Sequence, residues 1–134
     1  MKLESCTLLV RDLDEALDFY LDVLGFEKRG YAADDRPWLA GVGPPAQPDL
    51  RIVLEAPSVD PVVPPSDRWT IEDLMARGLL GRLVFLTDDC DEVFEQLEAV
   101  GTEVMQEPVD RPDGARDCAF RDPSGNLLRF VQPR

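Results

Sequence analysis

Apolar residues recur along the chain at two different spacings, and the two spacings follow one another in a fixed order. Residues 3–10 are rich in strand formers, and from Asp12 to Gly25 the apolar residues recur every three or four positions. That period predicts an amphipathic helix with Asp12 as its N-cap and Gly25 just past its end. Three more strands are predicted at 26–31, 36–43 and 49–55.

The second half of the chain repeats this order. A shift of 77 residues places Asp12-Leu13-Asp14-Glu15 on Asp89-Cys90-Asp91-Glu92. A strand at 81–87 precedes this segment, and a helical stripe follows it and ends at Gly101. The remaining strands are predicted at 102–107, 115–121 and 126–132, so each half reads β-α-β-β-β.

Two such units are each too small to close a core alone, so we expect their sheets to pair. The predicted fold is a single α+β domain over 1–134, with two βαβββ modules forming a curved eight-stranded sheet around a cleft and helices outside. The first module is expected at 1–55 and the second at 81–134. Residues 56–80 form a proline-rich connector, with a short helix at 70–77 capped by Thr70 and Asp73.

Composition narrows the function classes. The chain has 134 residues, 27 acidic against 14 basic, and a net charge of −13. That balance argues against nucleic-acid partners and against anionic membranes. No signal peptide or spanning segment is predicted, so a cytoplasmic protein is expected.

The chain has no histidine, which removes the usual imidazole base and the commonest transition-metal ligand. Its three cysteines form no CxxC pair. Cys6 is predicted to be a core residue and Cys118 a residue of the core or of the barrel wall, and Cys90 stands at a helix start without a base nearby. A catalytic cysteine is therefore not expected.

Two stretches resemble a known family. The run TLLVRDLDEALDFYLDVLGFE and the later FRDPSGNLLRFVQP are similar to the glyoxalase/bleomycin resistance/extradiol dioxygenase superfamily, also called vicinal oxygen chelate. The resemblance covers nearly the whole chain and implies the same paired βαβββ fold. It also implies a small-molecule ligand and a homodimer, because family members commonly dimerise and their clefts are sometimes completed by both chains.

Enzymatic members of that family hold one divalent metal in the cleft. The resemblance maps its four ligand positions onto Ser5, Glu55, Arg82 and Arg129. Only Glu55 is an ordinary ligand, and a guanidinium cannot coordinate a metal. We therefore predict no metal and no cofactor.

Strand alternation gives the residues expected to line the cleft. They are aromatic, aliphatic and charged: Ser5, Thr7, Trp38, Arg51, Val53, Glu55, Trp69, Arg82, Val84, Arg129 and Val131. Trp38, Trp69 and Tyr31 could stack on a planar ligand.

Two interpretations of Arg82, Glu55 and Arg129 remain open. The arginines could clamp an anionic ligand, or they could neutralise Glu55 in an ion-paired plug.

The predicted function is metal-independent binding, or sequestration, of a small metabolite or drug, aromatic ligands included. One alternative is a lyase or isomerase with Glu55 as general base and the two arginines stabilising an anionic intermediate. Another is a non-catalytic protein with a vestigial pocket.

Overall fold

The computed structural model describes residues 1–30 and 36–134, and both halves of the chain follow the predicted order of elements. Tyr31, the last residue of the strand predicted at 26–31, lies outside the described residues. The first half contains β1 (Ser5–Leu9), α1 (Leu13–Leu17), a π-helical turn (Asp18–Val23), β2 (Glu27–Lys28), β3 (Leu39–Gly43) and β4 (Arg51–Glu55). The second contains β5 (Arg82–Leu86), α3 (Cys90–Ala99), β6 (Glu103–Asp110), β7 (Arg116–Arg121) and β8 (Leu127–Gln132).

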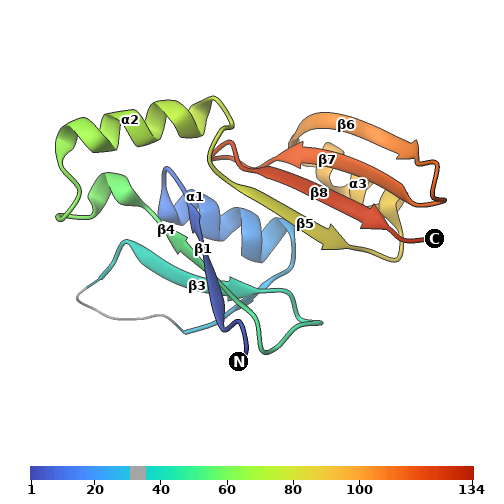
Figure 1. Cartoon of the computed structure of the whole chain (residues 1–134), viewed down its shortest axis with the longest axis horizontal. Coiled ribbons are helices and arrows are strands. Elements are labelled where there is room, and N and C mark those ends of the chain that lie inside the picture. The colour runs from blue at the N-terminus through green and yellow to red at the C-terminus, as the bar shows by residue number, and fades with distance from the viewer. Residues whose placement is uncertain (31–35) are drawn as a thin grey trace.

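The eight strands are divided between two four-stranded sheets of identical topology. Their orders are β1-β4-β3-β2 and β5-β8-β7-β6. The first and last strands of each half run parallel, and the other neighbours are antiparallel. In Figure 1 the first module (β1–β4 with α1) lies on the left and the second module (β5–β8 with α3) on the right. The predicted α+β class and its two βαβββ modules are confirmed.

The two module helices begin in the same way, as the sequence repeat predicts. Asp12 Oδ1 accepts from the backbone N–H of Glu15 at 2.8 Å, and Asp89 Oδ1 accepts from that of Glu92 at 3.0 Å. The first helix then widens into the π-helical turn, which the spacing of apolar residues did not predict. Within that turn the adjacent residues Phe19 and Tyr20 are both buried.

The connector helix is longer than predicted. α2 spans Pro65–Ala76, so it begins at Pro65 and not at Thr70. Proline is accepted in the first turn of a helix, where its missing N–H has no partner to lose. Thr70 is therefore inside the helix, and its hydroxyl donates to the carbonyl of Ser66 at 3.1 Å. The connector also contains a 3₁₀ turn at Pro57–Val59.

The helix-facing sides of both sheets contribute to one shared core. Leu8, Ile52 and Leu54 of the first module join Phe120 and Leu128 of the second in this cluster. Phe26 and Phe85, from opposite modules, meet edge to face with ring centroids 5.6 Å apart. The two modules are therefore packed together through their helix sides.

The cysteines belong to this core or border it. Cys90 and Cys118 are buried, and Cys6 is partly buried against the same cluster. Burial raises the pKa of the Cys118 thiol to about 12 and also raises that of Cys90. Both therefore stay protonated thiols at neutral pH, which agrees with the prediction that they are not nucleophiles.

A buried polar contact joins the two modules as well. The Tyr20 hydroxyl donates to Asp122 Oδ2 at 2.7 Å. Asp122 stands in the turn between β7 and β8 and is 4% exposed, and Tyr20 is fully buried. Burial and the neighbouring carboxylate raise the pKa of Tyr20 well above its ordinary value, so the phenol remains a donor.

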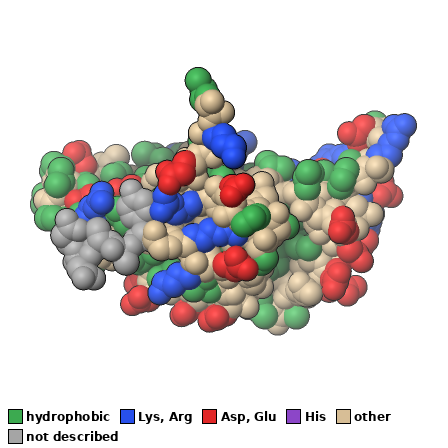
Figure 2. Space-filling model, turned by 90° about the horizontal axis from the view of Figure 1, so that it is seen from below, with side chains coloured by type: hydrophobic (Ala, Val, Ile, Leu, Met, Phe, Trp, Pro, Cys, Tyr) green, Lys and Arg blue, Asp and Glu red, His purple; other side chains and the backbone are tan. Residues whose placement is uncertain are grey.

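The surface charge is uneven. Figure 2 views the molecule from below and shows most Lys and Arg side chains between the left and the centre, with others at the upper right. Acidic side chains are spread along the lower edge and on the right. None of the helices in the described part of the chain is long and apolar enough to cross a bilayer.

We expect Tyr20→Phe to lower the free energy of unfolding by about 1–3 kcal/mol, because a buried carboxylate loses a donor. Chemical denaturation of Tyr20→Phe, Asp122→Asn and the double variant measures the coupling between the two groups. A coupling energy of zero would contradict a direct contribution of this hydrogen bond.

Candidate functional site

Each sheet has one face that points away from the helices. In the first sheet, the strand register pairs Ser5 with Arg51, Thr7 with Val53, and Leu9 with Glu55. Partners across a ladder point to the same side of a sheet, opposite to buried neighbours such as Leu8 and Leu54. We call this side, with Leu39 and Gly41 of β3, the first face. The predicted positions of Ser5, Thr7, Arg51, Val53 and Glu55 on one face agree with this register.

The aromatic residues expected in the cleft lie elsewhere. Leu39 pairs with Glu55 and Gly41 with Val53, so Trp38 and Ala40 point to the opposite side of β3. Trp38 is partly buried against the core cluster. Trp69 is on α2 and is 72% exposed. The structure brings neither tryptophan onto the first face.

Arginine side chains cover part of the first face. A side chain at Gly41 would collide with the backbone of Arg29 and the side chain of Arg51. Arg29 donates to backbone carbonyls of the 44–50 loop, Pro44 at 2.7 Å among them. Val53, in the middle of the first face, is 6% exposed, so little of it is open to a ligand.

Glu55, at the end of β4, is a carboxylate of the first face. It is half-buried, and among the described residues no cationic side chain forms an ion pair with it. Burial, and to a lesser extent the nearby Asp60, raises the pKa of Glu55. The predicted plug of Glu55 with Arg82 and Arg129 is therefore not formed within one chain.

The corresponding face of the second sheet, which we call the second face, is more open than the first face. Its first row across the sheet is Leu86, Val131, Asp117 and Val109, and its second row is Val84, Arg129, Ala119 and Gln106. Arg82 and Leu127 lead the third row. Val84, in the middle of β5, is 67% exposed, and Leu86, at its end, is 78% exposed, so two large aliphatic side chains face solvent from one strand. The predicted residues Arg82, Val84, Arg129 and Val131 all lie on this face.

An ionic cluster, which we call the arginine cradle, stands beside these aliphatic residues. The Asp117 carboxylate is 7% exposed and accepts from Arg111 Nε at 2.9 Å and Nη2 at 3.0 Å. It also accepts from Arg129 Nη1 at 3.1 Å and from Gln106 Nε2 at 2.6 Å. The Gln106 carbonyl accepts from both arginines, at 3.0 and 3.1 Å. The two guanidiniums hold the pKa of Asp117 below its ordinary value.

The cradle differs from the predicted clamp in its members. Arg129 pairs with Asp117 of its own sheet, and its companion is Arg111, not Arg82. The position of Asp117 within the strand predicted at 115–121 could have indicated its role, because a carboxylate on a buried strand needs a cationic partner. Arg111 follows β6 in a turn, and nothing in its sequence pattern indicated that its side chain reaches back to the sheet.

The four positions that correspond to the family's metal ligands do not fit a divalent cation. They offer one hydroxyl, one carboxylate and two permanent cations, and Arg129 is already bound to Asp117. Across the described residues, no group of three or more cysteine, aspartate or glutamate side chains is arranged to hold a metal ion.

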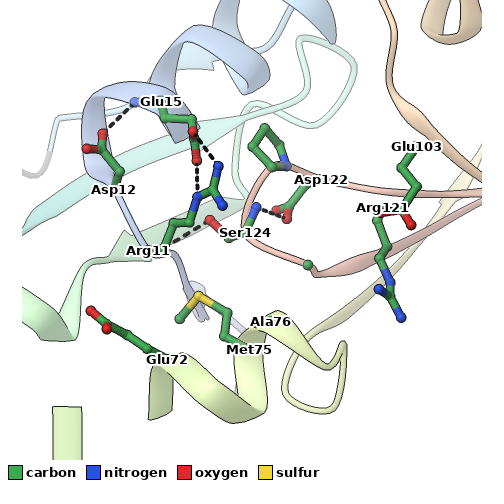
Figure 3. Close-up of a pocket in the computed structure, with 12 residues that line it drawn as sticks. Arg11, Asp12, Glu15, Glu72, Met75, Ala76, Glu103, Arg121, Asp122 and Ser124 are labelled. Atoms are coloured by element: carbon green, nitrogen blue, oxygen red, sulfur yellow. Dashed lines mark hydrogen bonds and ion pairs between the residues drawn. The ribbon is translucent and has the colours of Figure 1, made fainter. Parts of the chain in front are cut away.

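A separate cavity of about 560 Å³ lies at the junction of the modules. Figure 3 shows it between the start of α1, the end of α2 and the β7–β8 turn. Arg11 and Arg121 both line it, and Arg11 is paired with Glu15 at 2.7 Å. Acidic side chains such as Glu72 and Glu103 outnumber the two arginines in the lining. The sequence did not predict this cavity.

Comparisons with known proteins agree with the geometry. The model of the Glyoxalase/Bleomycin resistance protein/Dioxygenase superfamily matches residues 2–130. A lactoylglutathione lyase from Neisseria meningitidis is 29% identical, over 100% of this chain and 92% of the lyase. The crystal structure of UcmS2 has a TM-score of 0.88 and 32% identity, over 98% of this chain and 97% of UcmS2. TnmS3, an antibiotic binding protein from Streptomyces sp. CB03234, has a TM-score of 0.75 and 27% identity, over 100% of this chain and 97% of TnmS3.

The two carboxylates should affect stability with opposite dependence on pH. Asp117 has a lower pKa in the folded chain, so it adds stability at pH values above the ordinary carboxyl pKa of about 4. This contribution is lost as the pH falls through the folded-state pKa of Asp117. The raised pKa of Glu55 makes its ionisation costly, so stability falls as pH rises past about 4.

We therefore expect Asp117→Asn to lower Tm at pH 7, and Glu55→Gln to raise it. The difference in Tm between Glu55→Gln and the wild type should shrink as the pH falls below the ordinary carboxyl pKa. The difference for Asp117→Asn should shrink as the pH falls further, towards the folded-state pKa of Asp117. Thermal melts of the two variants and the wild type between pH 3 and pH 7 check this. Shifts of the same sign in both variants at pH 7 would contradict the assignment.

Proposed function

Because the chain belongs to the glyoxalase/bleomycin resistance/dioxygenase superfamily, we propose that it binds a small organic molecule without a metal ion. The observation that carries this proposal is the second face, where exposed Val84 and Leu86 stand beside the arginine cradle. Apolar surface with a few convergent polar groups is the usual composition of a small-molecule site. The likeness to TnmS3, named as an antibiotic binding protein, supports binding of a drug or drug-like metabolite.

We further propose that a second copy of the chain completes the site. Val84 and Leu86 are exposed aliphatic residues on the edge strand β5, and such a patch favours a partner surface. Glu55 of the first face and Arg129 of the second face do not meet within one chain. In a homodimer, the first face of one chain would lie opposite the second face of the other, which would bring both groups to one cleft. A cytoplasmic location belongs to this proposal too.

A catalytic role is the second candidate, and one observation favours it. Glu55 is half-buried and has no cationic partner among the described residues, and its pKa is raised, as a general base requires. The likeness to a lactoylglutathione lyase agrees with a lyase or isomerase. Arg82 and Arg129 would then stabilise an anionic intermediate across the cleft. The exposure of Val84 and Leu86 gives no support to the third alternative, a vestigial pocket filled by its own side chains.

Thermal-shift measurements with a panel of antibiotics and planar aromatic metabolites test the binding proposal. A ligand at about 100 times its Kd adds about 2.7 kcal/mol of stability, so Tm should rise by at least about 5 °C. The ligand should be recovered unchanged after incubation, whereas a turnover product that Glu55→Gln fails to form would favour the enzyme. Stoichiometric zinc, iron, nickel or manganese in the purified protein would contradict metal-independent binding.

Sedimentation analysis tests the homodimer. We expect Leu86→Lys to weaken dimerisation at least about tenfold, because it buries an ammonium in the proposed interface. Val100→Lys is the matched control, since Val100 is similarly exposed, at 61%, but lies at the end of α3. A wild-type monomer at 100 µM, or equal effects of the two variants, would argue against the proposed interface.

A further inference from the structure

The arginine cradle has more unused hydrogen-bond donors than unused acceptors. Both oxygens of Asp117 accept from arginine, and the carbonyl oxygen of Gln106 accepts from both arginines. Each of these side-chain oxygens thus already accepts at least one hydrogen bond from an arginine of the cradle.

Donors remain in excess. A guanidinium has five N–H donors. Arg111 uses three of them within the cradle, through Nε and Nη2, and Arg129 uses two, both from Nη1. The rest, on Arg111 Nη1 and on Arg129 Nε and Nη2, form no hydrogen bond to any other described residue. The side chains of Arg111 and Arg129 are 40% and 31% exposed, so a ligand can reach them.

The charge of the cradle points the same way. Two guanidiniums share one carboxylate, which leaves a local charge of +1 in a chain whose net charge is −13. The carboxylate lies beneath the arginines and is 7% exposed, so the positive groups are outermost. Asp117 also fixes both arginine side chains in place, which lowers the entropy lost when they bind a ligand.

The residues around the cradle describe the rest of the ligand. Val84 pairs with Arg129 across the ladder, and Leu86 with Val131. These aliphatic side chains are on the same face as the cradle, on the other side of β8 from Asp117 and Gln106. Guanidinium planes and aliphatic side chains both pack well against flat rings.

We infer that the arginine cradle binds the anionic end of the ligand, so that the ligand class is a planar organic acid, either a carboxylate or an ionised phenol. The inference rests on the proposed function, because it assigns a chemistry to the same site. The ligand's flat apolar body would lie over Val84 and Leu86, and its oxygens would accept from the free N–H groups of Arg111 and Arg129.

Isothermal titration of 2-naphthoate and 2-naphthamide tests this inference. The two probes share a ring system and differ in charge. The wild-type protein should bind 2-naphthoate at least about tenfold more tightly, since charge-assisted hydrogen bonds to arginine favour the anion. Arg111→Met and Arg129→Met should each remove most of that preference, so that the two probes bind with similar affinity in each variant.

Two further variants serve as controls. Arg77→Met removes one exposed arginine from α2 and should keep the full preference for 2-naphthoate. Arg129→Lys keeps the charge but not the planar fork, and should give an intermediate preference even if Arg129→Met fails to fold.

Equal affinity for the two probes would overturn the inference and leave the proposed binding function standing. A preference that survives in both methionine variants would also overturn it, because the anion would then be held elsewhere. Binding of neither probe would overturn the assignment of aryl carboxylates, whereas the proposed function is judged separately by the ligand panel.

Discussion

The carboxylate of Asp122 is the polar group on which the joining of the two modules depends. It accepts from the Tyr20 hydroxyl, from the backbone N–H of Ser124 and Asn126, and from the Asn126 side chain. Asn126 in turn donates to the carbonyl of Leu9, at the end of β1. A buried charge is tolerated only when it is hydrogen-bonded this fully. The contacts orient the β7–β8 turn against the first module, and β7 and β8 support the arginine cradle.

The sequence predicted those features that depend on short-range chemistry. The N-caps Asp12 and Asp89 were recognisable because a carboxylate three residues before a free N–H has one favourable geometry. Alternation placed Glu55, Arg82 and Arg129 on the correct faces, because the period of a strand is two. A one-residue error in β3 was enough to place Trp38 on the wrong side of its strand.

Features set by packing between distant segments were not predictable in the same way. Proline-rich composition suggested a late start for α2, although proline is acceptable in a first turn. The pairing of Arg129 with Asp117 and Arg111 depends on how a turn after β6 folds back on the sheet. The absence of histidine led to the prediction that no metal ion is bound, which stays a prediction. It did not indicate that a fixed pair of cations, held by a buried acid, stands on the second face.

The contacts that join the modules also have a kinetic consequence. Tyr20 and Asp122 are separated by 102 positions, and Leu9 and Asn126 by 117. Each module is built from neighbours that are much closer in sequence, so its strands and helix can form before the chain ends meet. Closing so long a loop lowers the entropy of the chain, and this cost precedes any stability gained from the contacts between the modules. A folding intermediate with two structured modules and an open seam would expose the Phe26 and Phe85 rings, so the seam is where aggregation of the nascent chain would start.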